Sequence, residues 1–326
     1  MHWKTKAHLL AVLSRMPLGE RVYRRMQRIA GTNRLNVSES LARCVEVVNL
    51  AHEAGYDSAG GTIVEIGTGW RPFLPLIFSL LGAKRIITFD IHPWMTGRYL
   101  KETCQALEAR IEDLAEELDV DAQPMRARFE EARAAMNRFA PASVLKAFRV
   151  DYRCPADATR SGLPAGSADL VCSSNVLEHV SQGLLSPLHA ESARILRPGG
   201  LAVHRFNPGD HFATVDRRIT TANFVRFSAS QWRWYGGSGL AYHNRLRCPD
   251  HARLMKQAGF ELALTRVRHN ERAARAIDSG ELPVHADFQQ FSTEELVADY
   301  MWIVGRRLPC EDVVVSRNTV SRAALS

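Results

Sequence analysis

The stretch IVEIGTGWRP at residues 63–72 is the most informative part of the sequence, because an apolar run leads directly into a Gly-x-Gly turn and a proline. The apolar run predicts a short buried strand at 62–66, and the proline predicts a helix at 72–81. Gly67 and Gly69 lack a Cβ, so the turn can approach a bound ligand, and the following helix offers free N–H groups. The segment therefore predicts a ligand-binding site at the carboxyl end of a strand.

The next acid along the chain narrows the choice of ligand. Asp90 lies 23 residues beyond Gly67, at the end of a second predicted strand at 85–89. A carboxylate there can accept hydrogen bonds from both hydroxyls of a ribose, which favours an adenosine-containing cofactor. Pro72 stands where the dinucleotide fingerprint has its third glycine, so a pyrophosphate would lack its usual cradle. Glu65 is placed to hold a cationic amino-acid group. The segment alone also allows an ordinary turn without a ligand.

Strands and helices alternate beyond this unit, which is typical of a parallel sheet covered by helices on both faces. Further strands are expected at 147–151, 169–173, 201–206, 260–267 and 300–304. We divide the chain into a basic helical segment at 1–36, broken near 17–19, a core domain at 37–308 that opens with a helix at 37–54, and a tail at 309–326. Two insertions interrupt the core: a helical hairpin at 95–140 and an aromatic-rich cap at 207–250, which follows a strand end where α/β enzymes bind ligands.

Several short motifs occur in a characteristic order. They are EIGTG at 65–69, Asp90, PADA at 155–158 with SADLV at 167–171, VLEH at 176–179, and LRPGGL at 196–201. As an ordered set they resemble the class I S-adenosylmethionine-dependent methyltransferases of the small-molecule type. The resemblance implies a Rossmann-like, doubly wound α/β fold whose seven-stranded sheet is mostly parallel and closed by an antiparallel hairpin. The bulky turn at 70–72 departs from the family pattern.

The resemblance also implies S-adenosylmethionine as the cofactor and S-adenosylhomocysteine as its product. The glycines of the first turn would pass under the cofactor, and the acid before them would lie near its amino group. Asp90, which ends the second strand, would bind the ribose, and Asp157 of the PADA block would bind adenine. The end of the fourth strand would lie near the sulfonium of the cofactor. The expected cofactor-binding residues are Glu65, Gly67, Thr68, Gly69, Asp90, Ile91, Asp157, Ala158, Ser174 and Asn175. Asp169, at the opposite end of the fourth strand, is interpreted as structural.

The methyl acceptor is harder to predict. Alignment of donor and acceptor can contribute up to roughly 7–11 kcal/mol to an in-line displacement, and a base is required only if the acceptor must lose a proton. His211, which follows the fifth strand beside Asp210, is the candidate base, whereas we interpret His204 within that strand as structural. Expected acceptor-binding residues are His179, Trp234, Tyr242, His243, Asn244 and Arg245. An aromatic core under a loop and surface ion pairing are the alternative interpretations of this region.

The net charge of +7 is concentrated at the N-terminus. Segment 1–36 holds eight cations and one acid, so the remainder of the chain is formally neutral. A nucleic-acid-binding protein would carry a broader basic face, so we expect no nucleic-acid partner. The segment is interpreted as a lid over the pocket or, alternatively, as a contact with an anionic membrane surface or a polyanionic glycan. The apolar positions expected to pack inward are Leu9, Leu10, Leu13, Val22, Met26 and Ile29.

Composition excludes several broad classes. The 326 residues are 46% hydrophobic and 24% charged, which is ordinary for a folded domain and not for a disordered chain. No apolar run reaches the roughly 18 residues of a bilayer span, and no signal peptide is recognisable. The six cysteines form no CxxC pair, so we expect neither a disulfide framework nor a zinc site, and no metal in the chain as a whole. A cytoplasmic protein is expected, with peripheral membrane contact left open.

We therefore expect a biosynthetic methyltransferase that acts on a small-molecule or glycan-type acceptor, with oxygen favoured as the target because of the candidate His–Asp base. One alternative is a nucleic-acid methyltransferase, which is disfavoured because the fourth strand ends Ser-Ser-Asn-Val at 173–176 and not Asn-Pro-Pro-Tyr. A second is an NAD-dependent oxidoreductase, which the missing third glycine disfavours. A third is a non-catalytic binding or scaffold protein. The sequence predicts neither the identity of the acceptor nor the oligomeric state.

Overall fold

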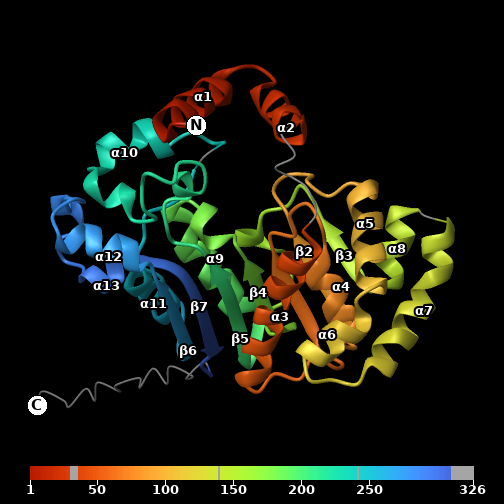
Figure 1. Ribbon diagram of the computed structural model, residues 1–326. Helices are drawn as coiled ribbons and strands as arrows, with labels where there is room; N and C mark the ends of the chain where they lie inside the picture. Colours follow the sequence, from red (N-terminus) through yellow and green to blue (C-terminus); the bar gives the residue numbers. More distant parts are fainter. Residues whose placement is uncertain (30–35, 139, 241, 310–326) are drawn as a thin grey trace, which may run out of the picture.

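The computed structural model describes residues 1–29, 36–138, 140–240 and 242–309, arranged around a central sheet (Figure 1). The sheet has the strand order β3-β2-β1-β4-β5-β7-β6. Its strands are β1 (Thr62–Ile66), β2 (Arg85–Phe89), β3 (Val150–Arg153), β4 (Ala168–Ser174), β5 (Leu196–Phe206), β6 (Phe260–His269) and β7 (Ala298–Arg307). Strands β1 to β5 pair in parallel, and β7 is antiparallel to both β5 and β6. The predicted Rossmann-like fold with a closing antiparallel hairpin is confirmed.

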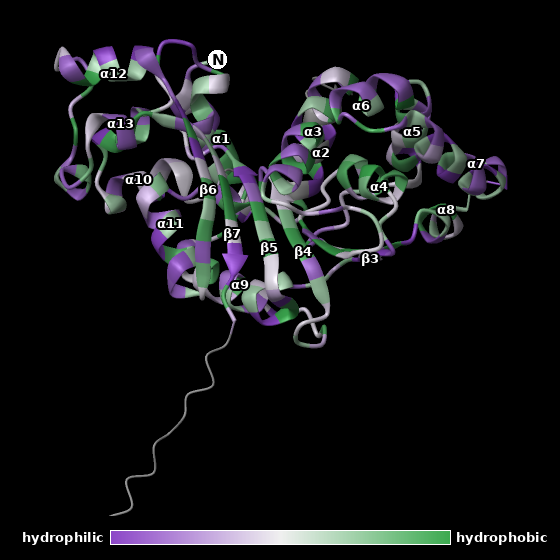
Figure 2. Ribbon diagram, turned by 90° about the horizontal axis from the view of Figure 1, so that it is seen from below, coloured by the Kyte–Doolittle hydropathy of each residue, from purple (hydrophilic) through white to green (hydrophobic). Residues whose placement is uncertain are grey.

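Helices bury both faces of the sheet, and successive residues of each strand contribute to opposite faces. In β1, Ile63 packs into one apolar cluster and Val64 into the other. The first cluster lies under α3 (Val37–Glu53), α4 (Phe73–Leu80), α5 (Gly97–Glu108), α6 (Ile111–Glu117), α7 (Ala122–Arg138) and α8 (Pro141–Ala147). The second lies under α9 (Gln182–Ile195) and α11 (Cys248–Gln257). All eight residues of α4 are buried, in agreement with its hydrophobic colouring in Figure 2.

The insertion at 95–140, predicted as a hairpin of two helices, contains three helices among its described residues. Its first arm is two helices, α5 and α6, which meet at Ala109–Arg110, and the second arm is α7. Of the apolar residues expected to face the core from this hairpin, Leu107, Leu114 and Phe129 are buried, Met136 is half-buried, and Phe139 lies outside the described residues. A further helix, α8, occupies 141–147, so the third strand begins at Val150 and not at the predicted 147.

A third apolar cluster lies beyond the edge of the sheet and builds the cap. It joins α10 (Ala229–Gly236), α12 (Glu271–Asp278) and α13 (Thr293–Leu296) to the first N-terminal helix, α1 (Trp3–Arg15). The ring of Trp3 lies 4.9 Å from that of Tyr235 and 5.7 Å from that of Phe212, measured between centroids. The backbone N–H of Trp3 donates to Asp216 Oδ2 at 3.0 Å. These contacts fix α1 to the cap, beside α10 in Figure 1.

The second N-terminal helix, α2 (Gly19–Ile29), follows α1 after a break at 16–18, close to the predicted break near 17–19. Of the apolar positions expected to pack inward, Leu10 and Leu13 are buried. Leu9, Val22 and Met26 are exposed instead, so that part of the prediction is wrong. The side chain of Ile29 lies outside the described residues. No helix in the described ranges is both long enough and apolar enough to cross a bilayer.

Candidate active site

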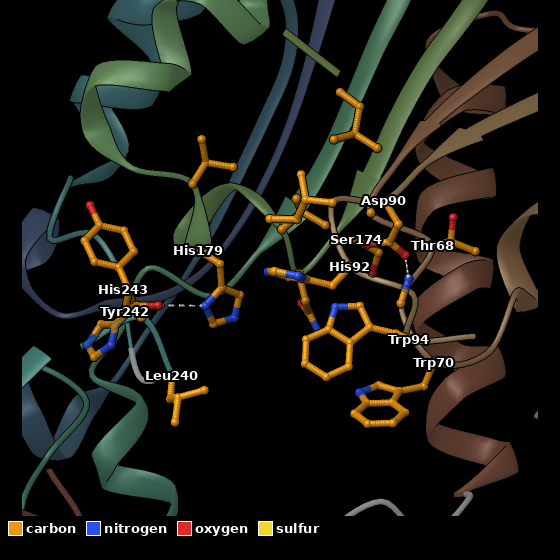
Figure 3. A pocket seen from close by; sticks show the side chains of 18 of the residues that line it. Thr68, Trp70, Asp90, His92, Trp94, Ser174, His179, Leu240, Tyr242 and His243 are labelled. Carbon is orange, nitrogen blue, oxygen red and sulfur yellow. Dashed lines mark hydrogen bonds between the residues drawn. The ribbon is translucent and has the colours of Figure 1, made fainter. Parts of the chain in front are cut away.

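A cavity of about 1450 Å³ lies at the carboxyl edge of the sheet, next to the point where the strand order reverses between β1 and β4. Figure 3 shows Asp90, Trp70 and Trp94 on one side of it and His179 and His243 on the other. All ten residues expected to bind the cofactor line this cavity: Glu65, Gly67, Thr68, Gly69, Asp90, Ile91, Asp157, Ala158, Ser174 and Asn175. Residues of α1 and α2 also line it, so the N-terminal helices form part of its wall.

The turn after β1 requires its glycines. Gly67 has φ +78° and Gly69 has φ +68°, a region that side chains rarely adopt. A Cβ on Gly67 would lie 2.5 Å from Val176 Cγ2, whereas a Cβ on Gly69 would meet nothing within 4 Å. Gly67 is therefore fixed by close packing against the segment after β4, and Gly69 by backbone conformation. Together they bring the backbone to the floor of the cavity.

Gly67→Ala should lower the free energy of unfolding by about 1–3 kcal/mol more than Gly280→Ala does, because it adds a steric clash to the same backbone strain. Gly280 is a matched control, since its φ is +76° and a Cβ there meets nothing within 4 Å. Urea denaturation of the two variants measures the difference. Equal losses of stability would contradict the close approach of Gly67 to Val176.

Two buried acids, Asp90 and Glu65, line the cavity beside this turn. Asp90 Oδ2 accepts a hydrogen bond from Gly69 N–H at 2.8 Å, and Glu65 Oε2 accepts one from Thr88 Oγ1 at 2.7 Å. Burial raises the pKa of Asp90 to about 6 and that of Glu65 to about 7. Neither forms an ion pair with a Lys or Arg in the described part of the chain. Both acids thus fit a ligand that brings an ammonium group and ribose hydroxyls.

Affinity for S-adenosylhomocysteine should rise by at least about tenfold between pH 5.5 and pH 7.5 and then level off. Below its pKa, Glu65 is protonated in the free protein, and an ammonium group binds the ionised form better. Binding in this range therefore releases protons, and affinity falls as pH falls. Calorimetry over this range measures the effect, and Glu65→Gln should flatten the profile. A flat profile in the wild-type protein would contradict the assignment of the two acids.

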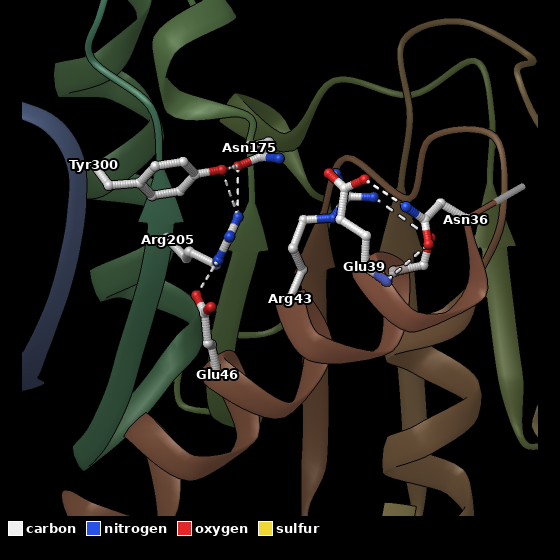
Figure 4. Close-up of polar contacts among 8 residues, drawn as sticks. Asn36, Glu39, Arg43, Glu46, Asn175, Arg205 and Tyr300 are labelled. Atoms are coloured by element: carbon white, nitrogen blue, oxygen red, sulfur yellow. Dashed lines mark hydrogen bonds and ion pairs between the residues drawn. The ribbon is translucent and has the colours of Figure 1, made fainter. Parts of the chain in front are cut away.

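Asn175, at the end of β4, is held by a polar network that reaches three other elements (Figure 4). Its Oδ1 accepts from Arg205 Nη1 at 2.8 Å and from the Tyr300 hydroxyl at 2.9 Å. Arg205 also donates to Glu46 Oε2 of α3 at 2.5 Å. Asn175 has φ +55°, a conformation that costs energy and is retained where surrounding contacts enforce it. The network fixes the backbone at the place where the cofactor sulfonium is expected.

The segment after β3 lines the cavity further from the cap. Asp157 caps the short 3₁₀ helix η1 (Ala158–Arg160), since its Oδ1 accepts from Thr159 N–H at 2.8 Å. The rings of Trp70 and Trp94, which also line the cavity, lie 4.7 Å apart. The unusual turn at 70–72 therefore supplies an aromatic wall, and the neighbouring Arg71 forms a 2.7 Å ion pair with Glu102 of α5.

Histidines gather at the cap side of the cavity. His211 and His179 have ring centroids 5.0 Å apart, and His211 stacks on His243 at 4.9 Å. His211 Nε2 lies 3.3 Å from the carbonyl oxygen of Asn207, which can only accept, so Nε2 carries the proton and Nδ1 keeps its lone pair. Burial, with a smaller contribution from His179, lowers the pKa of His211 to about 4. His211 is therefore neutral at neutral pH.

Asp210 is placed differently from its neighbour His211. It is buried and is not among the residues that line the cavity. Its carboxylate accepts from Phe212 N–H at 2.8 Å and from Asn223 Nδ2 at 2.9 Å, and His243 Nε2 lies 3.9 Å away. Burial raises the pKa of Asp210 to about 7. Its hydrogen bonds shape the loop that carries His211.

The residues expected to bind the acceptor separate into two groups. His179, Tyr242 and His243 line the cavity. Trp234, Asn244 and Arg245 do not line it, so their prediction as acceptor-binding residues is not supported. Trp234 is 71% exposed, Asn244 Nδ2 donates to the carbonyl of Leu177 at 2.7 Å, and Arg245 Nη1 donates to that of Phe227 at 2.5 Å. Asn244 and Arg245 brace loops around the site because their side chains point to backbone carbonyls.

Sequence reasoning missed several lining residues. Lys6, Arg43, His92 and Trp94 all line the cavity. His92 and Trp94 follow Asp90 closely in the sequence, so their place just after the second strand could have predicted that they line the site. Lys6 and Arg43 come from α1 and α3, and no local pattern in the sequence brings them to the site.

Comparison with known proteins agrees with this geometry. The family model described as "Methyltransferase domain" matches residues 38–265, which is more than half of the chain. The chain belongs to this family and is a class I S-adenosylmethionine-dependent methyltransferase. S-adenosylmethionine is its cofactor, and the glycine turn with its two unpaired acids fits that molecule. The comparison with curated proteins returned no match.

Solved structures with a similar fold include an S-adenosylmethionine-dependent methyltransferase from Mesorhizobium loti, with 16% identity, 79% of this chain and 96% of that chain covered, and a TM-score of 0.43. A second is a phosphoethanolamine N-methyltransferase from Haemonchus contortus in complex with phosphomonomethylethanolamine and S-adenosylhomocysteine (14% identity, 81% and 53% covered, TM-score 0.42). A third is a geranyl diphosphate methyltransferase in complex with S-adenosylmethionine. It has 13% identity and a TM-score of 0.43, and the match covers 82% of this chain and 85% of that chain. Similarity at this level carries no information about the acceptor.

Proposed function

We propose that this methyltransferase transfers the methyl group to a hydroxyl oxygen of a small-molecule or glycan-type acceptor. The observation that carries the proposal is the neutral His211, whose Nδ1 lone pair is left free at the cap side of the cavity while Nε2 is held by the Asn207 carbonyl. A hydroxyl acceptor must lose its proton, and a positioned neutral imidazole can take it. An amine acceptor that arrives unprotonated would not need such a group.

The cofactor supplies a methyl group on a positively charged sulfur. The chain has to hold donor and acceptor in line, which contributes much of the acceleration in a displacement of this kind. Asp90 and Glu65 would hold the two polar ends of the cofactor, and the braced Asn175 would shape the wall at the sulfur. His211 would bind the acceptor hydroxyl and accept its proton, with Asp210 positioning the loop beneath it.

The acceptor would lie against a mixed aromatic and polar wall. Tyr242, His243 and Leu240 line this part of the cavity, together with His179. His179 Nδ1 lies 3.0 Å from the Tyr242 carbonyl, which ties the loop after β4 to the cap (Figure 3). Such a wall suits a ring-shaped acceptor, planar or sugar-like, which can contact aromatic faces and still form hydrogen bonds.

We further propose that α1 and α2 act as the lid of this site. Leu10 and Ser14 of α1 and Tyr23 of α2 line the cavity, while Trp3 anchors α1 to the cap. Removing residues 1–31 should therefore reduce turnover of a small soluble acceptor, because the cavity would lose part of its wall and admit water.

The outer surface of the same helices favours a second proposal, contact with an anionic membrane. Val12, Val22 and Met26 are 56%, 44% and 42% exposed and do not line the cavity, and they lie among exposed cations such as Arg15 and Arg25. Exposed apolar groups beside cations are suited to an anionic lipid surface, where each cation contributes about 1 kcal/mol. An acceptor attached to a lipid would then meet the lid side of the cavity.

Vesicle sedimentation at low salt tests this contact. The full-length protein should bind vesicles that contain anionic lipid, and the triple variant Val12→Ser, Val22→Ser and Met26→Ser should bind at least about tenfold more weakly. Leu308→Ser is the control, because Leu308 is a 47% exposed apolar residue at the end of β7. Failure of the full-length protein to bind such vesicles would eliminate the membrane proposal and leave the lid intact.

The proposed reaction is tested by incubating the protein with methyl-labelled S-adenosylmethionine and a panel of hydroxylated small molecules and saccharides. Each compound is paired with its O-blocked counterpart as a control. Label should pass to one or more hydroxylated compounds and to none of the blocked ones. Transfer that persists after blocking, or that occurs only to amines, would contradict an oxygen acceptor.

A further inference from the structure

Three potential ligand groups meet at the cap side of the cavity. Glu178 and His179 belong to the 3₁₀ helix η2 (Leu177–His179) after β4, and His211 begins the 3₁₀ helix η3 (His211–Thr214) after β5. One ligand atom from each of the three residues lies within 4.8 Å of the other two. Two imidazoles and one carboxylate are therefore close enough to share one ion, although they come from separate turns of the chain.

One nitrogen of each imidazole already contacts a backbone carbonyl. His179 Nδ1 lies 3.0 Å from the Tyr242 carbonyl, and His211 Nε2 lies 3.3 Å from the Asn207 carbonyl. Carbonyls only accept, so these nitrogens are protonated, and the lone pairs are on His179 Nε2 and His211 Nδ1. Imidazoles that bind metals are oriented in this way, with the second nitrogen donating to a carbonyl or carboxylate.

Glu178 provides an independent observation. The residue is 1% exposed, and its Oε1 accepts from Asn207 N–H at 3.2 Å. Its Oε2 is buried and has no hydrogen-bond partner. A buried carboxylate oxygen without a partner is costly, and a bound cation would remove that cost. Asn207 thus orients two of the three groups, Glu178 through its N–H and His211 through its carbonyl.

We propose that Glu178, His179 and His211 form a binding site for a divalent transition-metal ion. Two imidazoles and a carboxylate suit Mn²⁺, Fe²⁺, Co²⁺ or Zn²⁺ better than Mg²⁺ or Ca²⁺, which prefer oxygen ligands. Three protein ligands leave coordination positions open, and the acceptor oxygen is the group available to fill one. The inference rests on the proposed function, because it specifies how the same site would hold the acceptor.

The site changes the role of His211 in the proposed reaction. With the ion bound, His211 is a ligand, and the ion favours loss of the acceptor proton to water by lowering the pKa of the bound hydroxyl. The prediction of no metal rested on cysteine spacing. The present cluster contains no cysteine, and only folding brings η2 next to η3.

Metal binding is measured on the full chain without acceptor. The protein is freed of metal with a chelator, dialysed against Mn²⁺, Co²⁺ or Zn²⁺, and analysed for metal content, and the Co²⁺ form is examined by visible absorption. Roughly one ion per chain is expected in the wild-type protein. His179→Ala and His211→Ala should weaken binding by about 100-fold or more, and Glu178→Gln similarly. His179 is exposed, so its variant tests the site without disturbing the core.

His92→Ala is the matched control, since His92 is an exposed imidazole that lines the same cavity and does not belong to the cluster. It should bind the ion as the wild-type protein does. Absence of binding in the wild-type protein up to millimolar metal, or binding that survives both His179→Ala and His211→Ala, would overturn the proposal. Full methyl transfer to hydroxylated acceptors after complete chelation would also overturn it and leave the proposed function standing. Metal binding without transfer to any hydroxyl would instead contradict the proposed function.

Discussion

His211→Ala should lower kcat for methyl transfer by about 100-fold or more, while affinity for S-adenosylhomocysteine stays near the wild-type value. In the proposed reaction His211 acts on the acceptor proton, either by accepting it or through a bound ion, and it lies at the cap side of the cavity. Its removal should therefore affect the reaction and not cofactor binding. Single-turnover kinetics on an acceptor identified by the label-transfer screen, together with calorimetry, separate the two effects.

His269→Ala is a suitable control, because His269 is exposed at the end of β6 and does not line the cavity. It should leave kcat unchanged. If His211→Ala also retained wild-type kcat under conditions where methyl transfer limits the rate, His211 would have only a structural role. The assignment of oxygen as the target would then lose its main support.

Asp90→Ala should weaken binding of S-adenosylhomocysteine by about 1.5–3 kcal/mol, or roughly 10- to 150-fold. The carboxylate is buried at the end of β2, already accepts one hydrogen bond from Gly69 N–H, and is available to the ribose hydroxyls. Isothermal calorimetry measures the change directly.

Asp169→Ala is the matched control for this variant. Asp169 lies at the opposite edge of the sheet, where it accepts from Thr62 N–H at 2.8 Å and pairs with Arg197 at 2.6 Å. Its loss should reduce stability and leave cofactor affinity near normal. An Asp90→Ala protein that is folded and binds with wild-type affinity would contradict the role of Asp90.

The fold and the cofactor side could be predicted from the sequence because their signals are local. The strand, the turn at Gly67 and Gly69 and the start of α4 are contiguous, and Asp90 directly follows a strand of apolar residues. Parallel strands bring their carboxyl ends to one edge, so residues that end successive strands had to meet. The bounds of β1 and β2 were predicted to the residue.

The cap side could not be predicted in the same way, because side-chain direction there depends on tertiary packing. Trp234 and Trp232 are both on α10, yet Trp232 is buried in the cap and Trp234 points to solvent. Arg245 was expected to bind the acceptor, but its guanidinium donates to the Phe227 carbonyl, and the nearby Arg247 is fully buried and donates to the Pro208 carbonyl. His204 is buried as expected, with Nδ1 2.8 Å from Ser173 Oγ.

The most direct test of the account is to identify the atom that receives the methyl group. The protein is incubated with S-adenosylmethionine that carries a ¹³C-labelled methyl group and with the acceptor found by screening, and the product is examined by carbon NMR. We predict a labelled methyl group on oxygen, formed by the wild-type protein and much more slowly by His211→Ala. A labelled methyl group on nitrogen or carbon, or an equal rate of formation in the variant, would contradict this prediction.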